Sequence, residues 1–338
     1  MGEKLVITTM RNEGPFILEW VAWYRMLGFD HVVILYNDCT DHSPALLQAL
    51  DDAGIITAVP YTPDPNLPVK STALPLMHSL PRVQSAEWVF NCDVDEFLVV
   101  HAGEGMLDDL IAKFDPSQTH GIAVYWKCFG DGHNLGWEDE FTHQSFTRSA
   151  KSKHTVNIFF KTLVRWPMHF GRLGVHSPRG WRGTGQWGEG PNQLWCCDGQ
   201  VLSAYSPQNN IKHTTSPVVT HDYAQVNHYI TRTSESFALK RGTPSTAANK
   251  NRYTERFFKD KNRNEVRDES ALKYAARFEA AYAEVSSAPN AMMLHHQCCM
   301  DYVEALSEVH NRPYLEDVRW EFHKEERDKF DTSPTHAD

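Results

Sequence analysis

Hydrophobic and polar positions along the first hundred residues predict strands that alternate with helices. Short apolar runs rich in β-branched residues predict four buried strands, at residues 5–9, 31–36, 55–59 and 87–92. Apolar side chains at helical spacing and helix-compatible composition predict the helices that separate or follow them, at residues 15–27, 44–53, 72–86 and 106–114. Strands joined by helices need crossover connections, so the pattern predicts an α/β protein with a mostly parallel sheet.

The pattern loosens after Gly121. Strand-like runs are expected at residues 122–125 and 156–164, and the glycine-rich stretch 171–190 is expected to form long loops. Helical patterns return near the C-terminus, at residues 234–242, 269–285 and 291–310. The last two are predicted to form a hairpin around Ala288-Pro289-Asn290, and the tail after Phe330 is predicted to be disordered.

Composition narrows the class of protein. The chain holds 33 Lys+Arg against 43 Asp+Glu, a net charge of −10, which excludes a general nucleic-acid binder because such binding needs a cationic surface. The seven cysteines include two adjacent pairs, which suits reduced thiols better than disulfides. The N-terminal segment lacks a signal-peptide core, and no stretch approaches the roughly 20 apolar residues that span a bilayer. We therefore expect a cytoplasmic protein, compatible with peripheral contact at the inner face of a membrane.

Two carboxylates, Asp93 and Asp95, follow the fourth predicted strand directly. Residues 87–115 hold eight acids and one base, so little nearby in sequence neutralises this pair. Carboxylate oxygens with few protein ligands suit Mg²⁺ or Mn²⁺ shared with substrate phosphates. The alternative is that Asp93 caps the following turn and Asp95 is solvated. The position after a strand, in an alternating series whose ligand sites lie beyond the carboxyl ends, favours the metal site.

Several motifs resemble those of a known enzyme family. They are Thr9-Met-Arg-Asn-Glu-Gly14, Glu19-Trp20, Asn37-Asp38 with Thr40-Asp41, Asp93-Val-Asp-Glu-Phe97, Trp126-Lys-Cys-Phe-Gly130 and His228-Tyr-Ile-Thr-Arg232. Together they resemble the family-2-type glycosyltransferases of GT-A fold, in particular a bacterial subgroup. The resemblance implies a Rossmann-like GT-A sheet flanked by helices, with a C-terminal helical appendage.

The resemblance also implies roles for individual residues. Those implied to hold the nucleotide of a sugar donor are Arg11, Asn12, Glu13, Asn37 and Asp38. Those implied to hold a divalent cation (Mn²⁺ or Mg²⁺) bridging the diphosphate are Asp93 and Asp95, with His228 as a further ligand. His228 could equally be a buried imidazole bonded to a carbonyl group. The implied phosphate partners are Arg232, Lys240 and Arg241.

An inverting transferase needs a base near the acceptor hydroxyl. Residues 136–140, Gly-Trp-Glu-Asp-Glu, provide the best candidates, with Asp139 or Glu138 as base and Trp137 stacking on a sugar. Asp131 is an alternative, and His133 and His176 stay open. A retaining enzyme would need no such base. Trp126, Phe129 and Trp137 are the candidate acceptor contacts.

The leading hypothesis is a metal-dependent glycosyltransferase that moves a sugar from a nucleoside diphosphate donor, expected to be UDP-linked, to a glycan or lipid-linked acceptor in polysaccharide biosynthesis. The alternatives are an inactive carbohydrate- or nucleotide-binding protein and a nucleotidyltransferase; a single glycine in the first loop weakens the latter. We expect a transferase domain over 1–245, with a donor half at 1–115 and an acceptor half at 116–245. A helical extension over 246–330 and a tail at 331–338 would follow. The basic segment 240–267 is expected to face the acidic rim.

Overall fold

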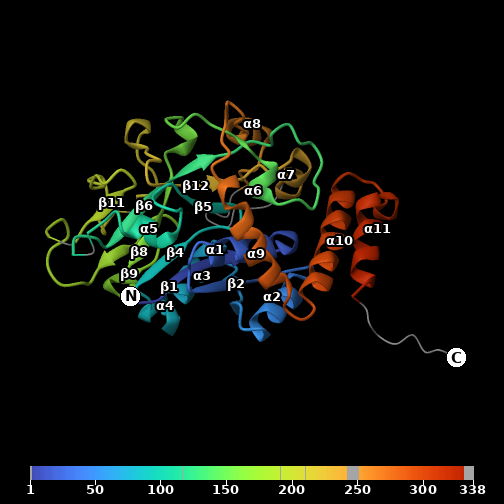
Figure 1. Cartoon of the computed structure of the whole chain (residues 1–338), viewed down its shortest axis with the longest axis horizontal. Coiled ribbons are helices and arrows are strands. Elements are labelled where there is room, and N and C mark those ends of the chain that lie inside the picture. The colour runs from blue at the N-terminus through green and yellow to red at the C-terminus, as the bar shows by residue number, and fades with distance from the viewer. Residues whose placement is uncertain (1, 116, 191, 210, 242–250, 331–338) are drawn as a thin grey trace.

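The computed structural model describes residues 2–115, 117–190, 192–209, 211–241 and 251–330. Within them, nine strands form one sheet in the order β3-β2-β1-β4-β8-β6-β12-β5, with β11 paired to β6 beside this path (Figure 1). These strands are β1 (Lys4–Met10), β2 (His31–Tyr36), β3 (Thr57–Pro60), β4 (Trp88–Asn91), β5 (Glu96–Val100), β6 (Gly121–Cys128), β8 (Phe160–Arg165), β11 (Leu194–Cys196) and β12 (Ala224–His228). Two small ribbons pair β9 (Phe170–Arg172) with β10 (Arg179–Trp181) and β7 (Arg148–Ser149) with β13 (Val266–Arg267).

The pairing directions confirm the predicted α/β class with a mostly parallel sheet. Strand β1 pairs in parallel with β2 and β4, and β2 with β3. The loops after β1, β2 and β4 therefore lie at one edge of the sheet, as the sequence predicts. Strand β8 runs antiparallel to β4 and β6, and β5 runs antiparallel to β12. Residues 92–95 connect β4 to β5 and carry Asp93 and Asp95; we call them the acidic segment.

Helices cover both faces of the sheet. They are α1 (Ile17–Met26), α2 (Ser43–Asp52), α3 (Val69–Ser79), α4 (Pro81–Ser85), α5 (Leu107–Ile111), α6 (Thr142–Ser145), α7 (Ser234–Lys240), α8 (Glu255–Lys261), α9 (Ala275–Ser286), α10 (Ala291–Val309) and α11 (Val318–Asp328). Side chains alternate along β1, so that Val6 enters the core beneath α1 while Leu5 and Ile7 pack with Met77 of α3. The larger core also takes in apolar residues of α9 and α10.

Helix α1 ends where the sequence predicts, at a glycine. Gly28 has φ +94°, a left-handed conformation that glycine adopts without a Cβ penalty. Its N–H donates to the Arg25 carbonyl, and the Phe29 N–H donates to the Tyr24 carbonyl. The rings of Tyr24 and Phe29 meet at a centroid distance of 5.5 Å. These bonds and this contact form a Schellman motif, which turns the chain into β2.

Helix α10 packs against α11, against α2 and against the short 3₁₀ helix Gly14–Phe16 that follows β1. Gly14 lies so close to α10 that a Cβ there would stand 2.4 Å from the Cβ of Cys298. The loop after β1 can approach α10 this closely only because residue 14 is glycine.

Several predicted elements are corrected by the structure. The helix expected over 72–86 is two helices, because Pro81 forces Leu80 into an extended conformation. The strand expected over 156–164 begins only at Phe160, after a 3₁₀ turn, and the glycine-rich loop region contains the β9-β10 ribbon. Helices α9 and α10 follow one another as predicted, but α9 packs mainly on α1 and α10 mainly on α11. Helices α6, α8 and α11 were not predicted.

Among the described residues, no helix is both long and apolar enough to cross a membrane. The predicted domain boundary at residue 245 and the predicted disordered tail at 331–338 lie outside the described residues. The division of the chain into domains stays a prediction.

The hydroxyl of Tyr24 joins α1 to the strands on either side of the acidic segment. This buried group donates to the Glu96 carbonyl at 3.0 Å and accepts from the Leu98 N–H and the Cys92 thiol.

We expect Tyr24→Phe to lower the free energy of unfolding by about 1–3 kcal/mol, because a buried N–H loses its acceptor. Urea denaturation measures the change. Tyr314→Phe, at an exposed ring, is the matched control, and equal effects of the two substitutions would contradict the prediction.

Candidate active site

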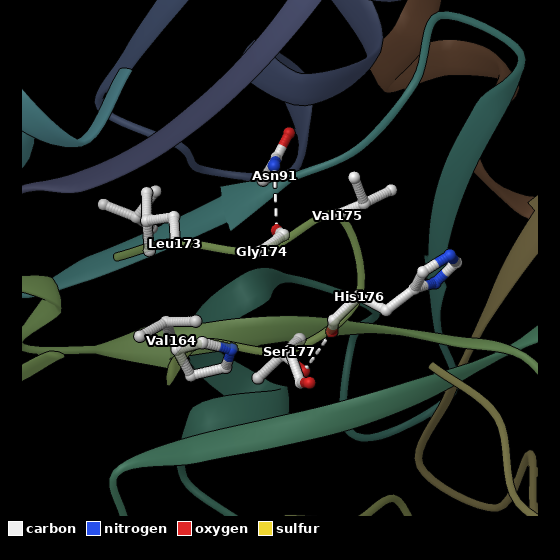
Figure 2. Close-up of a pocket in the computed structure, with 10 residues that line it drawn as sticks. Asn91, Val164, Leu173, Gly174, Val175, His176 and Ser177 are labelled. Carbon is white, nitrogen blue, oxygen red and sulfur yellow. Dashed lines mark hydrogen bonds between the residues drawn. The ribbon is translucent and has the colours of Figure 1, made fainter. Parts of the chain in front are cut away.

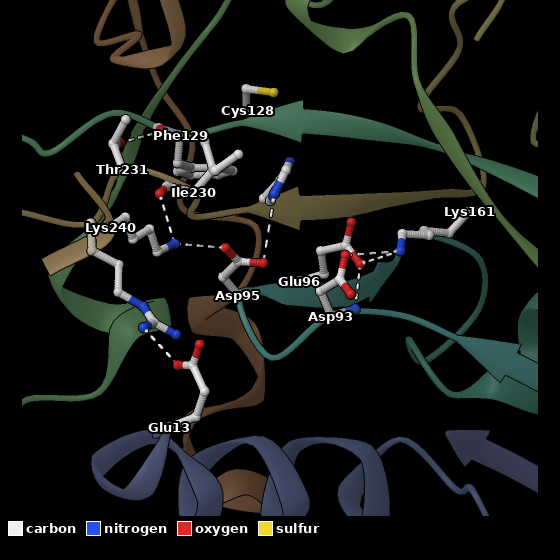
Figure 3. Close-up of polar contacts among 12 residues, drawn as sticks. Glu13, Asp93, Asp95, Glu96, Cys128, Phe129, Lys161, Ile230, Thr231 and Lys240 are labelled. Atoms are coloured by element: carbon white, nitrogen blue, oxygen red, sulfur yellow. Dashed lines mark hydrogen bonds and ion pairs between the residues drawn. The ribbon is translucent and has the colours of Figure 1, made fainter. Parts of the chain in front are cut away.

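The acidic segment presents Asp93 and Asp95 at the carboxyl edge of the sheet, each held by cationic side chains (Figure 3). The Asp93 carboxylate forms ion pairs with Lys70, from the start of α3, and with Lys161 of β8, whose Nζ lies 3.2 Å from Oδ2. Burial alone would raise the pKa of Asp93, but Lys161 and Lys70 outweigh it and hold the pKa well below its usual value. Asp93 is therefore ionised.

Lys161 also pairs with Glu96, the first residue of β5, at 2.9 Å. Both side chains are buried, with exposed fractions of 1% for Lys161 and 0% for Glu96. Burial raises the pKa of Glu96 to about 7 although Lys161 opposes the shift. Burial would lower the pKa of Lys161, but Asp93 and Glu96 raise it above its usual value. The buried ammonium of Lys161 thus forms ion pairs with two carboxylates and fixes the position of the acidic segment.

The second aspartate, Asp95, meets a different set of partners. Nζ of Lys240, the last residue of α7, lies 3.2 Å from Oδ2, and Nε2 of His228 lies 3.6 Å from Oδ1. Burial raises the pKa of Asp95, but the Lys240 ammonium outweighs it and the pKa falls to about 2. Burial lowers the pKa of His228 to about 3, so its ring is neutral and can offer a lone pair. His228 also packs on Trp126, with a centroid distance of 4.1 Å.

Arg232 and Glu13 form the side of the site next to the 3₁₀ helix after β1. Nη1 of Arg232 lies 3.2 Å from Oε2 of Glu13, and the guanidinium stands 3.4 Å from the centroid of the Phe16 ring. Burial raises the pKa of Glu13, although Arg232 and Lys240 lower it. Asp95 is among the charges that act on Glu13, so the loops after β1 and β4 form one electrostatic unit.

The formal charges of this site nearly cancel, because Glu96, whose pKa is raised to about 7, is only partly ionised at neutral pH. Four carboxylates are held by four cations: Glu13, Asp93, Asp95 and Glu96 by Lys70, Lys161, Arg232 and Lys240. A dianion that bound alone would draw cations away from these carboxylates. A divalent cation and a diphosphate that bound together would add nearly balanced charge.

The predicted nucleotide-binding loops meet each other at the same edge. The side chain of Asn12 donates to Oγ1 of Thr40 at 2.9 Å and accepts from the Thr40 N–H at 2.8 Å. Asn12 and Asp38 both have left-handed backbones, with φ of 54° and 46°. The Asn37 amide donates to the Asp38 carboxylate at 3.1 Å, and Arg11 is exposed on the first loop. The five predicted residues, Arg11, Asn12, Glu13, Asn37 and Asp38, therefore border one edge, and their role stays a prediction.

The three predicted acids of the acceptor side lie in different surroundings. Asp131 is buried and accepts from the side-chain amides of Asn262 and Asn264, so it fixes the loop after β6. Asp139 lies 3.1 Å from Nε2 of His295 on α10. Glu138 is exposed and has no hydrogen-bond partner among the described residues.

The predicted acceptor aromatics are buried. Phe129 packs on Tyr229 in the core, and Trp137 packs on Tyr302 of α10. Trp126 is 9% exposed and lies under Lys261 of α8, whose Nζ is 5.9 Å from the ring centroid. Trp126 is thus the one of the three that borders the acidic site, through His228.

The remaining predicted residues are also placed. Arg241 pairs with Glu255 at the start of α8, and the basic segment 240–267 reaches the site through Lys240 and Lys261 instead. Burial lowers the pKa of His176 to about 3, and its Nδ1 lies 2.8 Å from the Phe160 carbonyl oxygen. His133 is exposed.

A small cavity lies beside β4, between Asn91, Thr162 and the segment 173–178 (Figure 2). The Asn91 amide donates to the Gly174 carbonyl at 3.1 Å, and the Thr162 hydroxyl donates to the His176 carbonyl at 2.7 Å. The cavity has room for about one water molecule and is far too small for a sugar nucleotide.

Sequence reasoning missed Lys70 and Lys161, the two cations of Asp93. Lys161 carried a usable signal, because a lone lysine inside the apolar run Phe159–Val164 needs a buried acid as its partner. Lys70 carried none, since its position follows only from how α3 packs on the sheet.

Comparison with known proteins gives a family-level match. The sequence model described as Glycosyltransferase family 92 matches residues 7–279. A glycosyltransferase family 92 protein from Ricinus communis is 29% identical over 107 residues, which cover 31% of this chain and 19% of the relative. This chain therefore aligns to about a fifth of that relative's length.

Two solved structures are also similar to the chain. The crystal structure of S. aureus TarS 1–349 covers 97% of this chain and 88% of its own at 12% identity, with a TM-score of 0.32. The crystal structure of S. aureus TarS covers 96% of this chain and 55% of its own at 10% identity, with a TM-score of 0.35.

The shared ammonium of Lys161 yields a stability prediction. We expect Lys161→Met to lower the free energy of unfolding by about 3–5 kcal/mol, because the buried Glu96 and the half-buried Asp93 lose their common cation. Urea denaturation measures the loss. The same substitution at Lys324, in an exposed pair with Glu321, should change stability by less than about 1 kcal/mol. A Lys161→Met protein as stable as the Lys324→Met protein would refute this account.

Proposed function

Because the chain belongs to glycosyltransferase family 92, we propose that it transfers a sugar from a nucleoside diphosphate sugar to an acceptor hydroxyl. The observation that carries the proposal is the pair Asp93 and Asp95, presented at the carboxyl edge of the sheet between partly exposed lysines. The family match is to family 92, and the finer resemblance to a family-2-type bacterial subgroup stays a prediction.

We propose that a divalent cation, Mn²⁺ or Mg²⁺, binds between this acidic pair and the donor diphosphate. The residues fit such an ion. Asp93 and Asp95 are ionised, and the neutral ring of His228 faces Asp95 across 3.6 Å without a hydrogen bond. When bound, the cation would stabilise the negative charge that develops on the leaving diphosphate. The near-zero net charge of the site supports joint binding of the cation and the diphosphate.

The lysines and Arg232 have complementary roles in this proposal. Lys70 and Lys240 are 14% and 25% exposed, so their ammonium groups can turn from the carboxylates to phosphate oxygens when a donor binds. Lys161 is 1% exposed and stays with Asp93 and Glu96, which keeps the acidic segment in place. Arg232 holds Glu13 and Phe16, and so positions the loop after β1.

The nucleoside would lie on the loops after β1 and β2, where Asn12 and Thr40 fix each other. A uridine nucleotide is the first donor to test. For the acceptor we propose a glycan or a lipid-linked glycan of polysaccharide biosynthesis, with the basic segment containing Lys261 as the surface that meets an anionic acceptor or membrane lipid.

Nucleotide and metal should stabilise the protein synergistically. We expect UDP with Mn²⁺ to raise the melting temperature more than the sum of the separate shifts, and Asp95→Asn to remove this synergy and the transfer activity. Thermal-shift assays over several nucleoside diphosphates measure it. Asp108→Asn, at an exposed acid paired with Lys4, is the control.

Two outcomes would contradict parts of this proposal. Full activity of the Asp95→Asn protein in excess chelator would refute the proposed cation site. Synergistic binding without transfer to any glycan would favour a nucleotide-binding protein of the same fold.

We further propose that the transfer inverts the configuration of the sugar, with Glu138 as the base. The acceptor oxygen bonds to the anomeric carbon as the bond to the diphosphate breaks, and the acceptor proton passes to the carboxylate. Asp139 and Asp131 were the other predicted acids, but each already has a partner, His295 and the Asn262/Asn264 amides respectively. Of these three acids, only Glu138 has a carboxylate without a hydrogen-bond partner among the described residues.

Glu138→Gln should lower kcat about 10²- to 10⁴-fold and leave KM for the donor nearly unchanged, because only the proton acceptor is lost. Steady-state kinetics with a radiolabelled donor sugar measure both constants. Glu140→Gln removes an acid from the same loop, one that instead accepts from Ser145, and should retain activity. Equal kcat values for the two variants would rule out Glu138 as the base.

A further inference from the structure

A second group of metal-ligating side chains lies apart from the acidic pair, where the C-terminal helices meet the loop after β6. Helices α10 and α11 run side by side (Figure 1). They bring three histidines and a cysteine to the carboxylate of Asp139: His295, His296 and Cys299 from α10, and His323 from α11. Asp139 is hard to recognise in the sequence as the partner of His295 and His296, because it lies more than 150 residues earlier.

The ligand atoms converge in two triads that share Asp139. In the first, one oxygen of Asp139, one nitrogen of His296 and one of His323 lie within 4.8 Å of one another, and the two Nδ1 atoms are 3.1 Å apart. In the second, Asp139 lies 3.1 Å from Nε2 of His295, which lies 3.6 Å from Sγ of Cys299. A tetrahedral zinc site places nitrogen and oxygen ligands about 3.3 Å apart and nitrogen and sulfur about 3.6 Å apart.

The geometry favours the histidine triad. The Nδ1 atoms of His296 and His323 are 3.1 Å apart, which is close to the spacing of two nitrogen ligands of one tetrahedral ion. Both rings are buried and come from two helices that pack on each other, so the pair is held in place. The other triad would need the Cys299 thiol to lose its proton when the ion binds.

We propose that Asp139, His296 and His323 bind a divalent transition-metal ion, with Zn²⁺ as the expected occupant. Two imidazoles and a carboxylate are a zinc ligand set, whereas Mg²⁺ and Ca²⁺ prefer oxygen. The histidines are 7% and 2% exposed, and the Asp139 side chain is 26% exposed, so an ion can enter past the carboxylate.

This ion would join three segments that are far apart in sequence. It would fix the loop 136–140 to α10 and α11 and stabilise the folded chain, since a preformed site does not exist in the unfolded state. It would also occupy Asp139, which is consistent with Glu138 as the base. The metal site itself does not rest on the proposed transferase function.

Zinc binding to the full-length, chelator-treated protein tests the proposal. Isothermal titration with ZnCl₂ and metal analysis after gel filtration should show one zinc ion per chain. His296→Gln, His323→Gln and Asp139→Asn should each weaken zinc binding at least tenfold, whereas His310→Gln, at an exposed histidine, and Asp95→Asn should not. Unchanged zinc binding in His323→Gln and Asp139→Asn would overturn it.

Two further readouts keep the test decisive if a variant is unstable. Zinc should raise the melting temperature of the wild-type and His310→Gln proteins but not of Asp139→Asn, whose residue is partly exposed. Substitution with Co²⁺ should give the visible absorption of a tetrahedral site without a thiolate charge-transfer band. A thiolate band that disappears in Cys299→Ser would overturn the assignment in favour of the triad of Asp139, His295 and Cys299.

Discussion

The buried ammonium of Lys161 is the constraint on which the active-site geometry depends. Carboxylates crowd the turn between β4 and β5, and two of them, Asp93 and Glu96, would repel each other inside the protein without a common cation. Lys161 projects from β8, the strand next to β4, so the order of strands decides where the acidic turn is held. Tyr24 and the loops after β1 and β2 then take positions around this fixed point.

The distribution of charge separates groups that hold the site from groups that can act in it. Lys161 and Arg232 are buried and keep the neighbouring segments in place. Lys70 and Lys240 reach the same carboxylates from helix ends and remain partly open to solvent. In the proposed donor complex, a diphosphate would therefore meet cations whose side chains can move on a framework that stays fixed.

The fold was more predictable than the site. Strand β2 and helix α1 could be located closely, because apolar runs and the glycine at 28 are local signals. Asp93 and Asp95 could also be singled out, because their position directly after a predicted strand is a local signal too. The partners of these acids could not, since Lys70 and Lys161 become neighbours only through packing. The grouping of Asp139 with His296 and His323 likewise depends on α11, whose largely polar sequence gave no apolar pattern to detect.

The close approach of Gly14 to Cys298 places the C-terminal helices behind the loop after β1. That loop ends in Phe16, whose ring lies under the Arg232 guanidinium, so α10 supports the loop that carries Glu13 and Phe16. The matched family region stops at residue 279, before α10 begins. A chain shortened to that region would keep Asp93, Asp95 and their lysines, yet it would lose the surface against which the first loop is packed. Transferring this site to another protein would therefore require the chain up to the end of α10.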